Sequence, residues 1–388
     1  MNNKIDNIRK YFYLYKKRHP RLVMTILMFI IIPLATGTIL GYEMSDNVAS
    51  SIPTVVVDHD NSDFSRDYLR YIDESESFNI IEYAQKDERV EQLIEESKAF
   101  VGVIIPQNFY SDMIEGKAPK ILNIYDGSTM AVVGVSKPSM TEIVMTVKAA
   151  YMKKIYEGKQ SVVPTQVMNQ VVPIQVTYRE LYNPTRNFRN FLLPGMLVGL
   201  IQVGIAIMGS ERGFENQRKE ISFLSNIKLI IGWGFMGAIS IFLCLIVQFL
   251  FYDMPYKGTL AGGVLLTILF SICITALGYI VGSFLSDRTF ATQVSALTVL
   301  PTTFLGGYTW PVIGMPVAFQ WISKFLPFTY YGDAVRELCL RPMEFHHLLP
   351  DMIFMVKFII AELLILYLVK RFTTHKEEME EDEWGVVL

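Results

Sequence analysis

The amino-acid sequence predicts a polytopic α-helical membrane protein with six transmembrane helices and an α/β (α+β) extracytoplasmic domain. Three observations lead to this fold class. Of the 388 residues, 51% are hydrophobic and only 19% are charged, whereas about 25% of a typical soluble chain is charged. The apolar residues gather in runs of roughly 20, the length that a helix needs to cross the hydrocarbon core of a bilayer. One long segment of ordinary polar composition separates the first run from the second.

The apolar runs justify the spans in chain order. The first run is longer than the hydrophobic region of a signal peptide, and no convincing small-residue cleavage site follows it, so we expect it to remain as a span. Polar or charged residues bound each later run. The predicted spans cover residues 22–41, 188–209, 229–251, 260–285, 290–309 and 351–370.

Lysine and arginine decide the orientation of the spans. Residues 1–21 hold a cluster of basic side chains and the single acid Asp6, and the loop 210–228 and the start of the tail 371–388 are also basic. The positive-inside rule therefore predicts a multi-pass protein of the plasma membrane with both termini in the cytoplasm. Within 1–21 the apolar spacing predicts an amphipathic interfacial helix, and the acidic residues of 371–388 predict a solvated tail.

Residues 42–187 are expected to form the domain outside the membrane. Strand-like runs alternate with helical segments, and this alternation is typical of α/β or α+β folds with right-handed crossovers. The expected strands cover residues 54–57, 78–83, 100–105 and 121–125, and a longer helix covers 139–157.

Polar residues after the first strand invite a catalytic interpretation, which we do not adopt. Asp58, Asp60 and Asp63 follow the strand directly, where aspartate commonly forms turns and helix caps. His59 has no partner at metal-ligand spacing. We therefore expect no catalytic residue and no metal site in this chain.

The sequence also limits the chemistry of the chain as a whole. It contains no G-x-x-x-x-G-K-[ST] phosphate loop, no G-x-S-x-G and no H-E-x-x-H, so we expect no cofactor bound by this chain. A net charge of −3 without a basic patch excludes a nucleic-acid-binding protein. Any transport against a gradient must draw its energy from an ion gradient or from another polypeptide.

Two segments outside the spans have unusual patterns. The loop 210–228 can form a short amphipathic helix, with Phe214 and Leu224 toward the membrane. Such a helix could transmit the movement of a partner protein, and the alternative is a plain interfacial helix. The segment 310–350 is too long and apolar for an ordinary outer loop, and proline and glycine interrupt its helices. We interpret it, with the end of the fifth span, as an outer gate or as an element that seals the bundle. The candidate gate residues are Gly306, Gly307, Trp310, Pro311, Phe328 and Tyr330.

Few polar residues lie within the spans. Glu362 lies in the middle of the last one, where a charge costs about 2.5–3.5 kcal/mol on insertion scales. We expect its carboxyl to be protonated, paired or exposed to a wet cavity, with Gln202, Gln248 or Gln293 as hydrogen-bond partner. Gln202, Gln293 and Glu362 are the candidate residues of a translocation path, and the alternative is a single interhelical contact.

Three stretches resemble the ABC-2 type exporter permeases with an extracytoplasmic domain, also called type V ABC transporters. They are IPTVVVDHDNSDFSRDYLRYIDES with FVGVIIPQNFYSDMIEGKAPKILNIYDGS, then SERGFENQRKEISFLSNIK, and FLGGYTWPVIGMPVAFQWISKFLPFTYYGDAVREL. The resemblance implies a dimeric permease, made of two copies or close paralogues, that works with cytoplasmic ATP-binding cassette subunits holding ATP and Mg²⁺. It also implies that the second stretch is the coupling helix. The implied coupling residues are Glu211, Arg212, Phe214, Glu220 and Leu224.

The expected function is therefore export of a hydrophobic or amphipathic cargo, such as a drug, a lipid-like molecule or an antimicrobial peptide. One alternative is a membrane sensor or scaffold whose outer domain binds a ligand or partner. A second alternative, an ion-coupled exporter, predicts more buried ionisable residues than Glu362 alone.

Overall fold

The computed structural model describes residues 20–44, 50–115, 117, 119–159, 181–184, 187–217, 219 and 221–385. The chain divides into two compact units. The sheet unit contains the strands and helices between the first two spans, and the helical unit contains the first span and everything from Arg189 onward. The interfacial helix expected within residues 1–21 lies outside the described residues, apart from the last two positions.

The sheet unit is built on four strands in the order β2–β1–β3–β4. They are β1 (Ile52–Asp58), β2 (Phe78–Ala84), β3 (Val101–Ile105) and β4 (Leu122–Tyr125). The central strand β1 is parallel to β2 and β3, whereas β4 pairs antiparallel with β3. Three consecutive valines, Val55–Val57, are at most 1% exposed, as expected for a strand covered on both faces.

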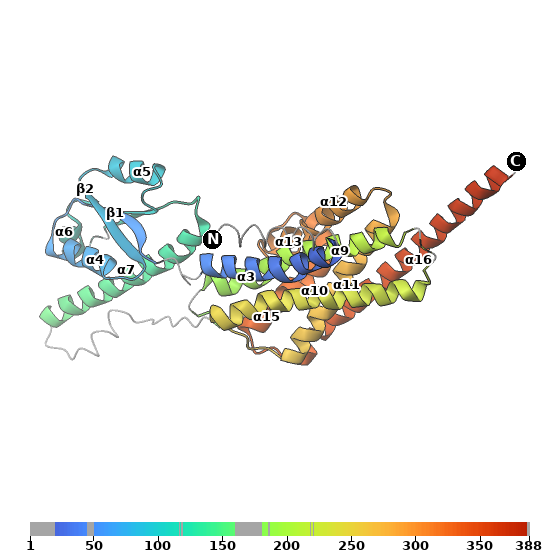
Figure 1. Ribbon diagram of the computed structural model, residues 1–388. Coiled ribbons are helices and arrows are strands. Elements are labelled where there is room, and N and C mark those ends of the chain that lie inside the picture. Colours follow the sequence, from blue (N-terminus) through green and yellow to red (C-terminus); the bar gives the residue numbers. More distant parts are fainter. Residues whose placement is uncertain are drawn as a thin grey trace, which may run out of the picture. The chain divides into compact units, whose positions relative to one another are not determined.

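Helices cover both faces of this sheet (Figure 1). Tyr68 and Ile72 of α4 (Asp63–Asp73) and Met140 of α7 (Met130–Lys159) share one core with Phe109 of the short α6 (Phe109–Ile114). On the opposite face, α5 (Asp87–Glu95) contributes Val90 and Leu93 to a second core. The Ser62 hydroxyl accepts a hydrogen bond from the Ser65 N–H at 3.0 Å and caps α4.

The aspartates after β1 serve local structure. Asp58 accepts hydrogen bonds from the backbone N–H groups of Asp60 and Asn61, both at 3.0 Å, and from the Ser65 hydroxyl at 2.6 Å. The Nε2 of His59 lies 2.8 Å from the Asp87 carboxylate, a contact that joins the turn after β1 to the first residue of α5. Among the described residues, no group of three or more His, Cys, Asp or Glu side chains could hold a metal ion.

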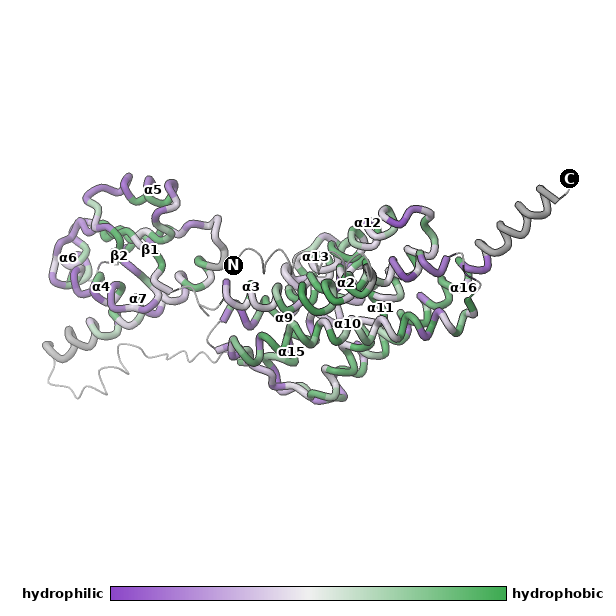
Figure 2. Tube along the Cα trace, viewed as in Figure 1, coloured by the Kyte–Doolittle hydropathy of each residue, from purple (hydrophilic) through white to green (hydrophobic). Residues whose placement is uncertain are grey.

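The described part of the helical unit contains five helical stretches that are long and apolar enough to cross a membrane. They are Leu22–Glu43, Phe188–Glu215, Phe223–Phe251, Leu260–Phe284 and Phe345–Arg371. The first consists of α2 (Pro20–Ile26), a π-helical turn η1 (Leu27–Ile31) and α3 (Ile32–Glu43). The others are α9 (Phe188–Glu215), α10 (Phe223–Phe251), α11 (Leu260–Phe284), and η3 (Phe345–Leu348) with α16 (Leu349–Gly385). Figure 2 shows hydrophobic residues along α9, α10 and α11.

The stretch expected as a single fifth span is divided. It consists of α12 (Arg288–Val299) and the single turn α13 (Thr302–Leu305), with Pro301 between them. Proline lacks an N–H and clashes with the preceding turn, and a 12-residue helix rises only ~18 Å. The chain then continues through η2 (Val312–Gly314), α14 (Val317–Ser323) and α15 (Pro327–Leu340).

Candidate functional site

The candidate site is formed by α9 and by the stretch 288–308, which holds the broken segment α12–α13 and the turn after it, and polar contacts join the two at three levels. Near the middle of α9, the amide of Gln202 donates hydrogen bonds to the hydroxyls of Thr302 and Thr303, at 3.2 and 3.1 Å. Gln202 is completely buried. A polar cluster therefore lies inside the bundle at the break beside Pro301, where side-chain hydroxyls commonly satisfy backbone groups that proline frees.

Tyr308 makes the second contact, near the start of α9. Its hydroxyl accepts a hydrogen bond from the N–H of Gly195 at 2.8 Å and donates one to the carbonyl of Phe191 at 3.0 Å. One turn of an α-helix ordinarily joins these two backbone groups to each other. The hydroxyl thus bonds the donor and the acceptor of one turn of α9, beside Pro194. A Cβ at position 195 would lie 2.3 Å from the Tyr308 ring, so this approach requires Gly195.

Aromatic and cationic groups enclose the Tyr308 ring, which is 2% exposed. The guanidinium of Arg336 lies 4.8 Å from the centroid of this ring and 4.7 Å from that of Phe191. The ring of Phe328 meets Tyr308 edge-on, with centroids 6.1 Å apart. Each cation–ring contact of this kind contributes about 0.5–2 kcal/mol, so Tyr308 and Arg336 hold α13 and α15 firmly against α9.

The third contact lies at the last turns of α9. The Glu211 carboxylate forms a two-point ion pair with the guanidinium of Arg288, the first residue of α12. Arg212 also bonds within the unit, because its Nη1 lies 2.8 Å from the Glu215 carboxylate and its guanidinium lies 4.2 Å above the Trp233 ring. Two of the expected coupling residues are therefore engaged inside this chain.

The remaining coupling candidates have different surroundings. Leu224 is 59% exposed in the first turn of α10, and Phe214 is half-buried in the last turn of α9. Glu220 lies outside the described residues. The loop 210–228 is shorter than expected, because α9 extends to Glu215 and α10 begins at Phe223. In the described part of this loop, no separate amphipathic helix lies between the two.

A small polar network anchors this loop. The Tyr279 hydroxyl of α11 donates to the Asn226 side-chain oxygen at 2.6 Å. The Lys370 ammonium of α16 donates to the same oxygen at 3.2 Å and to the Asn216 carbonyl at 3.4 Å. The loop is thus bonded to two other spans of the helical unit.

Glycines bring α9 and α11 into direct backbone contact. A Cβ at Gly209 or Gly213 would lie 2.5 or 2.1 Å from a carbonyl oxygen of α11, and a Cβ at Gly278 or Gly282 would lie 2.1 or 2.0 Å from a carbonyl oxygen of α9. Both pairs have the four-residue spacing of small residues that lets membrane helices approach closely. Real Cβ atoms do not reach such distances, so the two helices can pack this closely only with glycine at these positions.

The structure places the predicted gate residues in three different surroundings. Gly306 and Gly307 directly precede Tyr308, and Phe328 meets the Tyr308 ring. Gly307 adopts φ = +85°, which favours glycine. Trp310 is 59% exposed, and Pro311 is also exposed. The ring of Tyr330 stacks on Phe354 of α16, with centroids 3.9 Å apart.

The three candidates for a translocation path are not brought together. Gln202 lies at the α13 junction, whereas Gln293 is exposed on α12. Glu362 is 5% exposed, and neither carboxyl oxygen has a hydrogen-bond partner among the described residues. None of the expected glutamines pairs with it, since Gln248 instead donates to the Gly37 carbonyl of α3 at 2.5 Å.

Sequence reasoning missed several residues that build this site. The glycine spacing at 209/213 and 278/282 is visible in the sequence as small-x-x-x-small and could have been used. Tyr308 and Arg288 carry no such local signal, because Tyr308 bonds to a residue 113 positions away and Arg288 to one 77 positions away. Only the folded chain reveals these two contacts.

Comparison with known proteins defines the class. The model of the ABC-2 family transporter protein matches residues 21–368. This match covers most of the chain, which therefore belongs to the ABC-2 family of transporters, as the sequence motifs predict.

Individual relatives extend this finding. The chain is 20% identical over 297 residues to the probable multidrug ABC transporter permease YbhR of Escherichia coli strain K12, covering 74% of this chain and 77% of that protein. It is 23% identical over 186 residues to the permease YbhS of the same strain, covering 45% of this chain and 49% of YbhS. A 28% identical match to ABC transporter G family member 20 of Dictyostelium discoideum spans 45% of this chain but only 26% of that longer protein.

Proposed function

We propose that this chain is the permease subunit of an ABC exporter, powered by separate ATP-binding cassette subunits and working as two copies or as a pair with a close paralogue. The observation that carries the proposal is the family match over residues 21–368 in a sequence without a phosphate loop. This match supports transport rather than the sensor or scaffold alternative. The relatives named as multidrug permeases and the apolar spans support a hydrophobic or amphipathic cargo.

The proposed topology has six crossings, with both termini in the cytoplasm and the sheet unit outside. The sixth crossing is the broken segment α12–α13, whose polar break is covered by Gln202 of α9. Irregular backbone within a bilayer requires such cover. Labelling with a membrane-impermeant thiol reagent, after Cys244, Cys273 and Cys339 are replaced, tests this. Single cysteines at exposed Tyr83 and Leu122 of the sheet unit should react from outside intact cells, and one at exposed Leu224 should not.

The proposed mechanism uses α9 as the element that carries movement. One end of α9 enters the 210–228 loop, where the partner ATPase would push, and the other is bonded through Tyr308 to the segment that we propose as the outer gate. When that segment swings away, the Gly195 N–H and Phe191 carbonyl lose the hydroxyl but have each other as partners, since they lie one helical turn apart. The backbone groups of α9 therefore have a hydrogen-bond partner both when the segment is in contact and when it has moved away. This property suits an element with two stable states.

The ATPase contact is tested by co-purification. We expect Leu224→Asp to abolish recovery of the ATPase subunit with the permease, because Leu224 is exposed at the loop and a charge there would disrupt apolar docking. Leu122→Asp is the matched control, since Leu122 is a similarly exposed leucine of the sheet unit. Recovery of equal amounts of ATPase with both variants would contradict the assigned surface. Cargo transport by the chain alone, without any ATPase, would overturn the whole proposal.

A further inference from the structure

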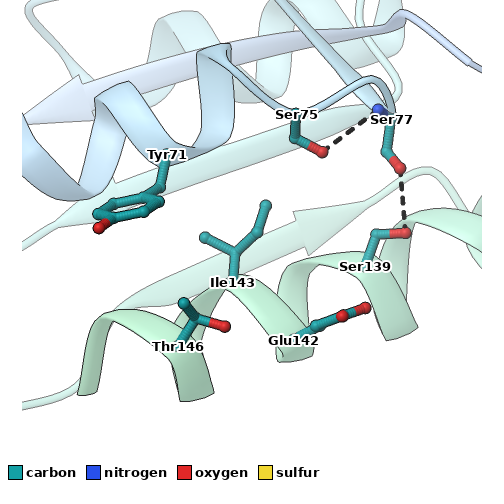
Figure 3. Close-up of a pocket in the computed structure, with 7 residues that line it drawn as sticks. All are labelled: Tyr71, Ser75, Ser77, Ser139, Glu142, Ile143 and Thr146. Carbon is teal, nitrogen blue, oxygen red and sulfur yellow. Dashed lines mark hydrogen bonds between the residues drawn. The ribbon is translucent and has the colours of Figure 1, made fainter. Parts of the chain in front are cut away.

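A polar hollow lies in the sheet unit, between the end of α4 and α7 (Figure 3). Its volume is about 300 Å³, at the lower end of the range for small-molecule sites. The end of α4 and the turn that follows it form one wall, and the middle of α7 forms the other. The lining residues are Tyr71, Ser75, Ser77, Ser139, Glu142, Ile143 and Thr146.

Hydroxyl groups converge on this hollow from both walls. The Ser77 hydroxyl donates to the Ser139 hydroxyl at 3.2 Å and so bridges the two walls. The Ser75 hydroxyl accepts a hydrogen bond from the Ser77 N–H at 3.3 Å. Two serines from the α4 side and one from α7 are thereby held in fixed positions, as Figure 3 shows.

Other polar groups of the hollow keep their full bonding capacity. Within the described residues, the Tyr71 hydroxyl, the Thr146 hydroxyl and the Glu142 carboxylate make no hydrogen bond or ion pair. Tyr71 is 38% exposed and offers an aromatic face. Ile143 of α7 supplies an apolar surface between Tyr71 and the serines. A site with a few convergent polar groups around aromatic and apolar surface is the usual form of a small-molecule site.

The charge of the lining selects the chemistry of the ligand. Among the residues that the structure describes, Glu142 is the one carboxylate that lines the hollow, and no lysine or arginine lines it. A carboxylate accepts hydrogen bonds strongly from hydroxyls and more strongly from ammonium groups, and it repels anions. We propose that this hollow binds a neutral or amino-bearing polyhydroxylated ring, the chemistry of a sugar or amino sugar. The inference stands apart from the transport function, since it needs neither an ATPase nor a particular cargo.

Each lining group then has a role with such a ring. Tyr71 and Ile143 cover one apolar face of the ring, as aromatic side chains do in contacts with C–H surfaces. The serine and threonine hydroxyls both donate and accept, so they match ring hydroxyls in either sense. The Glu142 carboxylate accepts from two neighbouring hydroxyls or from the ammonium of an amino sugar.

The experiment is titration calorimetry on the purified full chain in detergent, with glucosamine, glucose and glucose 6-phosphate as probes. We expect saturable binding of glucosamine and of glucose, with glucosamine about tenfold tighter, because one charge-assisted hydrogen bond contributes roughly 1.4 kcal/mol or more. Glucose 6-phosphate should bind at least tenfold more weakly than glucose. Glu142→Gln should remove the preference for glucosamine, and Tyr71→Ala should weaken both sugars.

Glu91→Gln is the matched control, because Glu91 is an exposed glutamate of α5 on the opposite face of the sheet; it should leave all affinities unchanged. Thermal unfolding of each variant checks that the fold is intact. Absence of saturable binding by either sugar overturns the proposal, as does equal binding of the phosphorylated sugar. A glucosamine preference that survives in Glu142→Gln also overturns it. The ATPase co-purification above is independent of all three results, so failure of one proposal is distinguishable from failure of the other.

Discussion

The two ends of α9 are bonded to the stretch 288–308, which runs from α12 to just past α13, by different chemistry. At the start of the helix, the Tyr308 hydroxyl bonds the Gly195 N–H and the Phe191 carbonyl and is shielded by aromatic rings and Arg336. At its end, Glu211 meets Arg288 in an ion pair whose side chains are 15% and 56% exposed. The first contact is dry and directional, and the second is partly solvated.

This difference has a mechanical consequence. Buried hydrogen bonds in a low-dielectric environment hold a fixed geometry and are costly to leave unmade, whereas a solvated ion pair is weak and screened by salt. The Tyr308 contact should therefore have discrete arrangements, and the Glu211–Arg288 ion pair should adjust more readily to a moving partner. The glycine contact with α11 lies at the same end of α9 as Glu211, from Ala206 to Gly213, and it keeps the backbone there on a fixed line while the ion pair adapts.

The largest expected effect tests that fixed line. Gly282→Leu would force a side chain against the Ser210 carbonyl, which lies only 2.0 Å from the position of a Cβ. Overpacking of a filled core costs about 1–3 kcal/mol and sometimes more, and backbone cannot yield as a flexible side chain does. We expect at least ~3 kcal/mol of destabilisation and little folded protein on size-exclusion chromatography.

Gly232→Leu provides the control for this substitution. Gly232 also lies in a membrane-length helix, α10, but a Cβ there would meet nothing within 4 Å. The control should fold at normal yield. Equal yields of the two variants would show that the α9–α11 contact does not limit the fold.

The second effect tests the dry end. Tyr308→Phe keeps the ring and removes the hydroxyl that bonds the Gly195 N–H and the Phe191 carbonyl. Loss of one partner of a buried hydrogen bond costs about 1–3 kcal/mol. The direct bond that one helical turn allows between these two backbone groups should keep the loss near about 1 kcal/mol. The measurement is the thermal unfolding midpoint in a fixed detergent.

Tyr331→Phe is a useful comparison for the same measurement. The Tyr331 hydroxyl is also buried, but it bonds the Thr267 hydroxyl, which retains its own hydrogen bond to the Gly263 carbonyl. This variant should lose less stability than Tyr308→Phe. A larger loss of stability in Tyr331→Phe than in Tyr308→Phe would contradict the role assigned to the Tyr308 hydroxyl.

The contrast between the units shows what a sequence can predict. The four expected strands lie within two residues of the observed ones, because alternation of buried valine and isoleucine with turn residues is a local signal. The membrane character of the helical unit is equally local, since it depends on the length of apolar runs. Pro301, two residues after the end of α12, is a local helix-breaking signal of the same kind.

The remaining features depend on residues distant in the chain. The expected end of the second span fell at residue 209, where polar residues begin, yet α9 continues to Glu215. Its last turns remain helical because Glu211 and Arg212 find partners on α12 and α10. Likewise, Gln202 and Gln248 looked like partners for Glu362, but each bonds to backbone or hydroxyl groups of a helix remote in sequence.

A third prediction concerns the centre of α9. Gln202→Leu removes the donor to Thr302 and Thr303 while keeping the volume of the side chain. Side-chain hydrogen bonds between membrane helices contribute about 0.6 kcal/mol on average, and Thr302 keeps its bond to the Val299 carbonyl. Stability should fall by about 0.5 kcal/mol. A loss of most of the cargo-stimulated ATP hydrolysis in this stably folded variant would assign Gln202 to coupling. Proportional changes in the two quantities would leave it a purely structural contact.

The smallest effect concerns the solvated end. Glu211→Gln and Arg288→Gln should each cost only a few tenths of a kcal/mol, as partly exposed ion pairs do, and added salt should reduce the difference from the parent chain because it screens the pair. The double substitution Glu211→Arg with Arg288→Glu restores opposite charges across the same contact, so it should recover most of the lost stability. The measurement is a double-mutant cycle of unfolding midpoints at low and high salt. A salt-independent cost, or a cost as large as that of Tyr308→Phe, would mean that the two contacts are equally rigid and that the ion pair is not the adjustable one.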